Sequence, residues 1–173
     1  MAIPADPKAW CVGLVGYGEV GRILAEDLRA QGLAVSAWDL KLASPASAAP
    51  LQAHAGRHGV VLAGSAAGLA ASSDLIISAV TASQAVPVAA DCAPTLQAGA
   101  FFLDFNSASP GAKQRAAVLV DGAGGRYVEG AVMTSIPPHR IRVPLLLGGP
   151  SAGALAPLVS TLGFAASVAS ARL

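Results

Sequence analysis

Charged side chains are scarce in this sequence of 173 residues. Only 12% of the residues are charged, and 11 basic against 10 acidic residues leave a formal net charge of +1. No run of basic residues forms a stripe that would neutralise many phosphates, so we expect no nucleic-acid partner. The rest of the composition, 54% hydrophobic with 19 glycines, is typical of an α/β protein whose sheet is covered on both faces.

Cysteine is also rare, and long apolar runs are missing. Cys11 and Cys92 lack the spacing of a metal site or a redox pair, so we expect two buried, small hydrophobic residues and no metal. Prolines and an acid occupy the first eight residues, where a signal peptide would need an apolar stretch. No later apolar run is long and helical enough to cross a bilayer. We therefore expect a cytoplasmic protein without a membrane partner.

The sequence does have a regular alternation of short apolar runs with longer segments of helical spacing. This rhythm predicts βαβ units and a parallel sheet. We predict strands over residues 11–15, 33–38, 60–62, 74–80, 100–105, 127–132, 145–147 and 164–168. Helices are predicted over 19–31, 51–57, a segment ending at 71, 83–92, a segment starting at 109–110, and 151–162, with a Ser-, Pro- and Ala-rich loop over 42–50.

A glycine pattern follows the first predicted strand. Residues 16–21 have the form GxGxxG, and Asp39 follows 21 positions after Gly18, at the end of the next strand. The motif alone is weak, but the strand before it, the helix after it and this acid are the context of a dinucleotide-binding turn. Gly16 would allow the turn, Gly18 would admit a pyrophosphate, and Gly21 would let helix and strand pack closely. The cofactor-binding residues predicted here are Gly16, Tyr17, Gly18, Glu19, Val20 and Gly21; the alternative is a glycine-rich turn without a ligand.

Asp39 bears on which dinucleotide binds. A carboxylate there accepts hydrogen bonds from a ribose 2′-hydroxyl and repels a 2′-phosphate, so we expect NAD rather than NADP. Lys41, two residues further on, would reach a 2′-phosphate, so NADP remains the alternative cofactor. The alternative role for Asp39 is a strand-end carboxylate that caps the following turn.

A polar stretch, residues 104–110, ends the predicted strand 100–105. It reads Asp-Phe-Asn-Ser-Ala-Ser-Pro, and ligands of open α/β sheets bind at the carboxyl ends of the strands. Asn106 and Ser107 are therefore candidates to contact a ligand. Their alternative role is an Asx turn and helix cap before Pro110.

Several of these motifs together resemble the β-hydroxyacid dehydrogenase and 6-phosphogluconate dehydrogenase superfamily. They are the glycine fingerprint, Val80-Thr81, residues 104–110, residues 127–133 and residues 145–149, and the likeness runs from about residue 10 to residue 168. The resemblance implies a doubly wound, mainly parallel Rossmann sheet in three αβα layers. It also implies one dinucleotide-binding domain over residues 1–173 and oxidation of a small hydroxy acid with NAD.

The resemblance also implies roles for single residues. Val80, Thr81 and Asn106 would line the cofactor cleft, with Asn106 and Ser107 beside the nicotinamide and the substrate hydroxyls. Met133, Thr134 and Ser135 would form the substrate-binding turn, where family members commonly have Ser-Gly-Gly. Because this turn departs from the family pattern, it leaves the substrate open.

The family's catalytic lysine lies in a second, helical domain that this sequence does not include. Lys8, Lys41 and Lys113 do not match its motif, and we expect Lys113 to be a solvated charge in the first turn of a helix. We expect the chain by itself to be inactive and the full-length enzyme to be a homo-oligomer.

A basic cluster follows the substrate turn. It comprises His139, Arg140 and Arg142, whose side chains would either bind a carboxylate or phosphate of the substrate or remain solvated.

Two other functional classes stay open. One is a free-standing, non-catalytic nucleotide-binding module, and the other is a different Rossmann reductase, of the imine or prephenate type.

Overall fold

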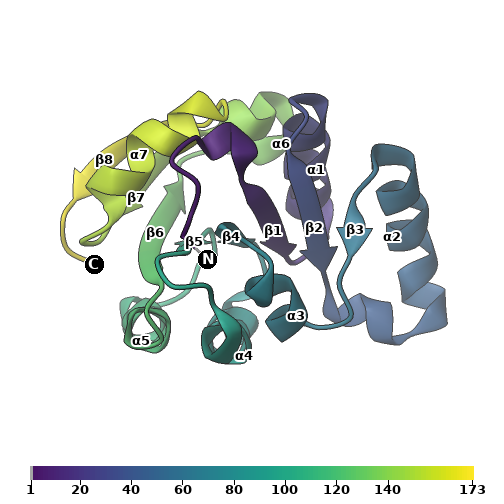
Figure 1. Cartoon of the computed structure of the whole chain (residues 1–173), viewed down its shortest axis with the longest axis horizontal. Helices are drawn as coiled ribbons and strands as arrows, with labels where there is room; N and C mark the ends of the chain where they lie inside the picture. Colours follow the sequence, from purple (N-terminus) through teal and green to yellow (C-terminus); the bar gives the residue numbers. More distant parts are fainter. Residues whose placement is uncertain (1) are drawn as a thin grey trace.

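The computed structural model describes residues 2–173 and contains one eight-stranded sheet (Figure 1). The strands are β1 (Cys11–Val15), β2 (Ala34–Trp38), β3 (Val61–Leu62), β4 (Leu75–Ser78), β5 (Phe101–Asp104), β6 (Arg126–Val132), β7 (Pro144–Gly148) and β8 (Ala165–Ser170). The helices are α1 (Glu19–Ala30), α2 (Pro45–His58), α3 (Ala66–Ala71), α4 (Ala85–Cys92), α5 (Pro110–Gly122), α6 (Ile136–His139) and α7 (Ala152–Thr161). Each predicted strand is present, with bounds shifted by a few residues.

The strand order confirms the predicted doubly wound topology. The order is β3-β2-β1-β4-β5-β6-β7-β8, and β1 to β6 pair in parallel. β7 lies antiparallel to β6, and β8 pairs in parallel with β7. The chain turns from one side of the sheet to the other between β1 and β4, and ligands of such folds bind outside the carboxyl ends of the strands at this switch point.

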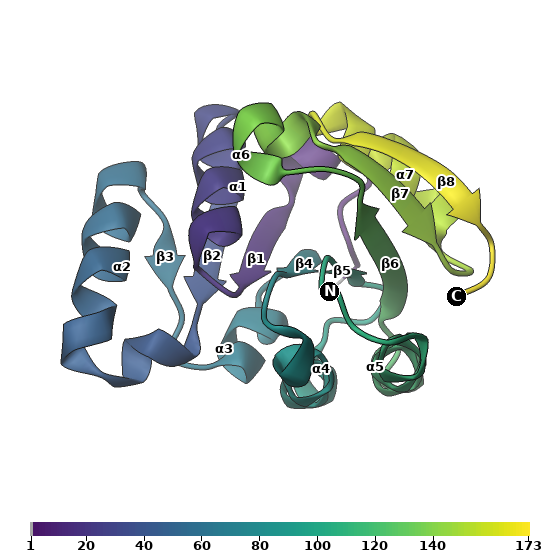
Figure 2. The same ribbon diagram turned by 180° about the vertical axis from the view of Figure 1, so that it is seen from behind.

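The sheet is covered on both faces, as the composition predicts. Figures 1 and 2 show α1, α6 and α7 on one side and α3, α4 and α5 on the other, with α2 beside β3 at the end of the sheet. Successive side chains of a strand point to opposite faces of the sheet. In β4, Leu75 and Ile77 accordingly pack in the core under α1 and α7, whereas Ile76 packs in the core under α3 to α5. The result is a three-layer αβα arrangement.

The predicted loop over residues 42–50 is wrong. After a short 3-10 helix (Leu40–Ala43), α2 begins at Pro45 and includes Pro50. Alanine is the best helix former, and a proline at the first helical position loses no hydrogen bond. The alanines of this segment therefore outweigh the turn signal of its serines and prolines.

The two cysteines differ in their surroundings. Cys92 is buried as predicted, and burial raises the pKa of its thiol to about 12. Cys11 is exposed, contrary to prediction, because it is the first residue of β1 and only the residues after it enter the core.

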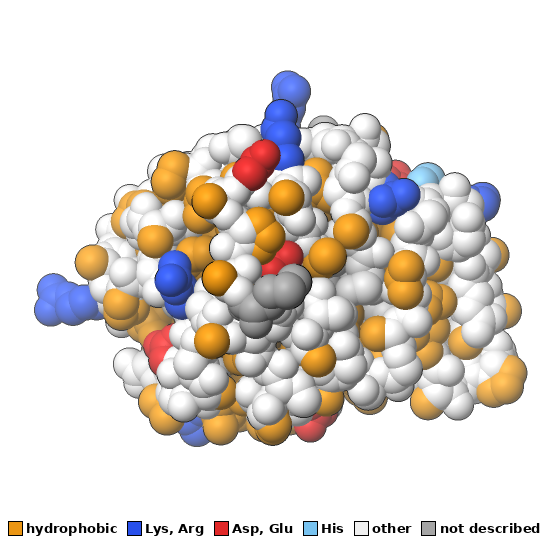
Figure 3. Space-filling model, viewed as in Figure 1, with side chains coloured by type: hydrophobic (Ala, Val, Ile, Leu, Met, Phe, Trp, Pro, Cys, Tyr) orange, Lys and Arg blue, Asp and Glu red, His pale blue; other side chains and the backbone are white. Residues whose placement is uncertain are grey.

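None of the helices within residues 2–173 is both long and apolar enough to cross a membrane. On the face in Figure 3, Lys and Arg side chains are scattered and form no continuous stripe.

Candidate functional site

The glycine turn between β1 and α1 leaves an open space above the backbone. Gly16 has a φ of 95°, and a Cβ atom there would collide with the carbonyl oxygen of Ala79. A Cβ atom on Gly21 would collide with the carbonyl oxygen of Gly16, so the third glycine allows α1 to approach the turn. At Gly18 a Cβ atom would meet nothing within 4 Å. The three glycines therefore have the separate roles that the motif predicts.

The amino terminus of α1 points its free backbone donors into that space. Gly18 is the N-cap residue, and no side chain caps it. The first N–H groups of a helix have no partner within the helix, and the helix dipole attracts negative charge there. The turn therefore fits the pyrophosphate of a dinucleotide, with both the room and the donors that this anion needs.

Asp39 is fixed at the end of β2 by two backbone donors. Its carboxylate accepts hydrogen bonds from the N–H groups of Tyr17 (2.8 Å) and Lys41 (2.9 Å). The capping role is therefore real, and it also joins the end of β2 to the glycine turn. A carboxylate has about four acceptor positions, so two contacts leave acceptors for ribose hydroxyls.

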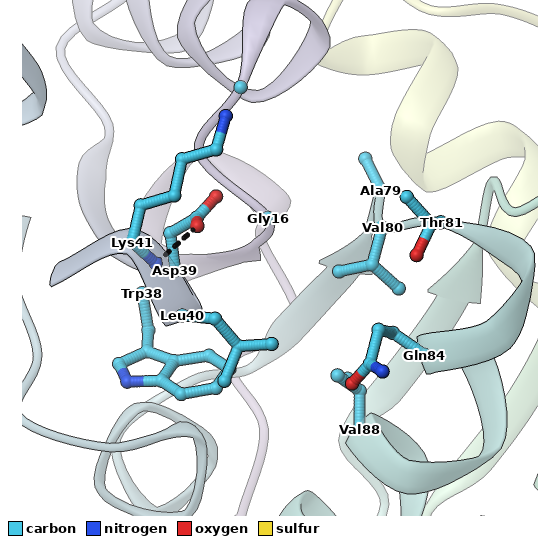
Figure 4. Close-up of a pocket in the computed structure, with 11 residues that line it drawn as sticks. Gly16, Trp38, Asp39, Leu40, Lys41, Ala79, Val80, Thr81, Gln84 and Val88 are labelled. Carbon is cyan, nitrogen blue, oxygen red and sulfur yellow. Dashed lines mark hydrogen bonds between the residues drawn. The ribbon is translucent and has the colours of Figure 1, made fainter. Parts of the chain in front are cut away.

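A cleft of about 340 Å³ lies between the ends of β2 and β4. Figure 4 shows Asp39 and Lys41 on one wall, facing Val80 and Thr81 on the other. Five further lining residues were not predicted: Trp38, Leu40, Ala79, Gln84 and Val88. Two signals in the sequence could have predicted four of them. Trp38 and Leu40 flank Asp39, and Gln84 and Val88 are one helical turn apart.

A second cleft, of about 680 Å³, adjoins the first along Val80 and Thr81. The predicted residues that line it are Glu19, Val20, Val80, Thr81, Ser107, Thr134 and Ser135. Six residues that were not predicted complete the lining: Ala79, Ala82, Phe105, Val132, Ile136 and Pro137. Met133 does not contribute to this lining and is 56% exposed. Residues predicted from four separate segments thus meet around one space.

Asn106 lies behind the clefts rather than in their walls. It is buried, its amide oxygen accepts from the N–H of Val80 (2.7 Å), and its amide nitrogen donates to the Ser78 hydroxyl (2.9 Å). Its side chain therefore positions the backbone of Val80. The helix cap is supplied by Ser109, whose hydroxyl accepts from the N–H of Ala112.

Tyr17 faces away from the clefts and contributes only its backbone to the turn. Its side chain is fully buried, and the hydroxyl lies 2.7 Å from Nδ1 of His54. Burial raises the pKa of Tyr17 to about 12.

Lys113 is buried, so the prediction of a solvated charge is wrong. Only 6% of it is exposed, and Nζ lies 3.3 Å from a Glu129 oxygen and 4.0 Å from an oxygen of Asp104, which is fully buried. The buried face of α5 comprises Ala112, Lys113, Ala116, Ala117 and Val120. Lys113 therefore shares the apolar stripe of its helix, a spacing that was visible in the sequence.

Asp104 connects this lysine to the cleft. Its carboxylate accepts from the N–H of Asn106 (2.7 Å) and from the hydroxyl of Tyr127 (2.6 Å). Burial and the neighbouring Asp104 carboxylate hold the pKa of Tyr127 well above its usual value, so the hydroxyl stays a donor. The buried network thus fixes Asn106 and, through it, Val80.

Arg140 is paired within the protein and is not free for a substrate anion. Its guanidinium donates to Glu26 (2.7 Å) and Asp27 (2.9 Å) of α1, and the neighbouring Ile141 N–H also donates to Asp27. These contacts hold Arg140 at a positive φ of 55°. His139 and Arg142 line another cleft with Arg140, away from the two described above.

Comparison with known proteins identifies the family. The model of the NAD-binding domain of 6-phosphogluconate dehydrogenase matches residues 11–136, which include the glycine turn, Asp39 and the polar residues after β5. A search of curated proteins finds no match.

Solved structures share the fold over most of this chain. A conserved hypothetical protein from Sinorhizobium meliloti 1021 is 34% identical, with a TM-score of 0.87, and the match covers 92% of this chain and 54% of that one. The 3-hydroxyisobutyrate dehydrogenase of Mycobacterium tuberculosis with L-serine is 18% identical, with a TM-score of 0.79, and the match covers 95% of this chain and 55% of that one. An imine reductase from Myxococcus stipitatus in complex with NADP+ is 20% identical, with a TM-score of 0.75, and the match covers 93% of this chain and 55% of that one. The two enzymes show the fold alone.

The chain therefore spans 54% to 55% of the length of these three structures. Its fold is that of the dehydrogenase cofactor domain, and its clefts lie at the switch point where such domains bind a dinucleotide. The chain belongs to the family of NAD-binding domains of 6-phosphogluconate dehydrogenase.

Proposed function

We propose that this chain binds NAD in preference to NADP and serves as the cofactor domain of a dehydrogenase that oxidises a small hydroxy acid. The observation that carries the proposal is the pair of adjoining clefts with a common wall at Val80 and Thr81. One cleft has the glycine turn and Asp39, which suit a pyrophosphate and a ribose. The other has the hydroxyls of Ser107, Thr134 and Ser135, which suit a small polar substrate.

The residues divide the work of binding between them. The free N–H groups at the start of α1 hold the pyrophosphate, and Asp39 accepts from the ribose hydroxyls. A bound nicotinamide would supply hydride-transfer chemistry at the carbon that bears the substrate hydroxyl. Ser107, Thr134 and Ser135 donate to the carboxylate or hydroxyl of the substrate and orient that carbon.

The first prediction concerns cofactor choice. The wild-type chain is expected to bind NAD more tightly than NADP, and Asp39→Asn should reduce the ratio of the two affinities by about tenfold or more, because a hydrogen bond to a charged group is worth about 1.5–3 kcal/mol. Asparagine keeps one acceptor for the backbone and removes the charge that repels a 2′-phosphate. Calorimetric titration with each cofactor measures the ratio.

Lys41→Met is the matched control, because it removes the nearby positive charge and leaves Asp39 in place. It should weaken NADP binding only. Equal wild-type affinity for both cofactors would rule out the selective role of Asp39.

The second prediction concerns turnover by the 173 residues alone. Within residues 2–173, Glu19 is the one ionisable side chain that lines the second cleft, and it is exposed. Positioned general acid–base catalysis contributes roughly 10²–10⁴-fold. The chain should therefore bind NAD yet turn over short hydroxy acids far more slowly than the usual enzyme median of about 10 per second.

Absorbance of reduced nicotinamide, measured with a panel of hydroxy acids and cyclic imines, tests this expectation and the substrate class together. Turnover near the median rate by this chain would contradict it. Imine reduction without hydroxy-acid oxidation by a longer protein that contains this chain would favour the imine-reductase alternative.

A further inference from the structure

Two histidines and one glutamate meet where α1 and α2 pack together, away from both clefts. One candidate ligand atom from each of Glu26, His54 and His58 lies within 4.8 Å of the other two. His54 and His58 are one helical turn apart on α2, and their rings lie 4.4 Å apart at an angle of 30°. Two histidines at i and i+4 present their side chains on the same helix face, the arrangement that binds zinc in helical metal sites.

The distances need little change to suit a metal ion. Oε1 of Glu26 lies 2.9 Å from Nε2 of His54 and 4.0 Å from Nε2 of His58. In a tetrahedral zinc site with bonds of about 2.0–2.1 Å, neighbouring ligand atoms are about 3.3 Å apart. To hold a metal ion, the Glu26 and His54 atoms would have to move slightly apart and the Glu26 and His58 atoms slightly closer. Small rotations of the side chains would make both changes.

Other side chains already hold two of the three residues. Arg140 donates to Oε2 of Glu26 at 2.7 Å, which leaves Oε1 facing the histidines. Arg29 donates to the carbonyl oxygen of His58 at 3.1 Å and fixes the end of α2 against α1. Contacts of this kind behind metal ligands hold the ligands in place and raise affinity.

One histidine of the cluster is buried and the other is partly exposed, so the cluster is reachable from solvent. The His54 side chain is 6% exposed and that of His58 is 36% exposed. An ion would therefore enter from the His58 side, and water would supply the fourth ligand. We propose that Glu26, His54 and His58 form a binding site for a divalent transition-metal ion of the Zn²⁺ type that joins α1 to α2.

The expectation of no metal came from cysteine spacing, and this cluster contains no cysteine. Its two histidines are four residues apart in the sequence, but Glu26 lies 28 residues before His54. Only the packing of α1 against α2 brings the third ligand to them.

The site would also contact the glycine turn. Nδ1 of His54 lies 2.7 Å from the hydroxyl of Tyr17. With Nε2 on a metal ion, a neutral His54 carries its proton on Nδ1 and donates to that hydroxyl. The hydroxyl proton then needs another acceptor, and an unpaired buried donor is unfavourable. We therefore expect metal binding about 5- to 150-fold weaker than at a site where every buried donor keeps a partner.

The test is a calorimetric titration of the metal-free chain with ZnCl₂, in a Cys11→Ser background that removes the exposed thiol. We expect one ion per chain, and His58→Ala should weaken binding by about tenfold or more, because losing even a residue behind a ligand typically costs about 10–100-fold in metal affinity. His139→Ala is the matched control, because His139 is the third histidine of the sequence and lines another cleft. The His139→Ala variant should bind Zn²⁺ as tightly as the parent does.

Co²⁺ gives a second readout that follows the ligands directly. The visible absorption of tetrahedral Co²⁺ should appear with the parent and be lost with Glu26→Gln and His58→Ala. Thermal unfolding without metal establishes that these variants fold. The proposal is overturned if the folded parent binds no Zn²⁺, or if His58→Ala binds it as tightly as the parent does.

Discussion

A Gly18→Val variant is expected to lose dinucleotide binding by about 100-fold or more, because its side chain would occupy the space that a pyrophosphate needs above the turn. The fold should survive the change. A Cβ atom at this position meets nothing within 4 Å, and the φ of Gly18 is −78°, so the turn does not need the left-handed conformation here. Calorimetric titration with NAD measures the loss, and circular dichroism establishes that the variant is folded.

Gly64→Val is the matched control for this experiment. Gly64 also faces open space, but it lines neither of the two clefts. The control should bind NAD as the wild type does. If Gly18→Val retains wild-type affinity, the dinucleotide does not bind at this turn.

A Lys113→Met variant should lose about 3–5 kcal/mol of unfolding free energy, the usual consequence of leaving a buried charge without its partner. Asp104 is fully buried, and after the change only the Asn106 N–H and the Tyr127 hydroxyl would contact its carboxylate. Urea denaturation measures the loss. Lys8→Met, at an exposed residue, is the control and should change stability by no more than about 0.5 kcal/mol.

The double variant Asp104→Asn, Lys113→Met separates charge from packing. Asparagine carries no charge; its amide oxygen still accepts from the Asn106 N–H, and its amide nitrogen donates to the Tyr127 hydroxyl oxygen. The double variant should therefore recover part of the stability that Lys113→Met loses, and the two changes should not be additive. A loss below about 1 kcal/mol in Lys113→Met would contradict the buried ion pair.

Patterns along the chain predicted the elements that depend on local spacing. The strands of the sheet were visible as short apolar runs, and the glycine turn was visible from three glycines between a strand and a helix. Asp39 was recognisable because it ends the second strand. These features follow from backbone periodicity and from the conformations that glycine allows, which are properties of neighbouring residues.

Local signals failed where two of them competed. In residues 42–50 the serines and prolines indicate a loop, while the alanines favour the helix that forms. At Lys113 the charge indicated solvent, although the spacing of the buried residues of α5 places it on the apolar face. In residues 42–50 the helix propensity of alanine prevailed, and at Lys113 the packing of the apolar helix face did.

The sequence by itself therefore determined the strands, the turn that suits a pyrophosphate and the acid beside it. The tertiary structure alone decided the polar pairs that join distant segments. Arg140 pairs with Glu26 across 114 positions, and Tyr17 meets His54 across 37. Such pairs have no periodic signature, because the partners share neither a helix nor a strand and meet only after the layers pack on the sheet.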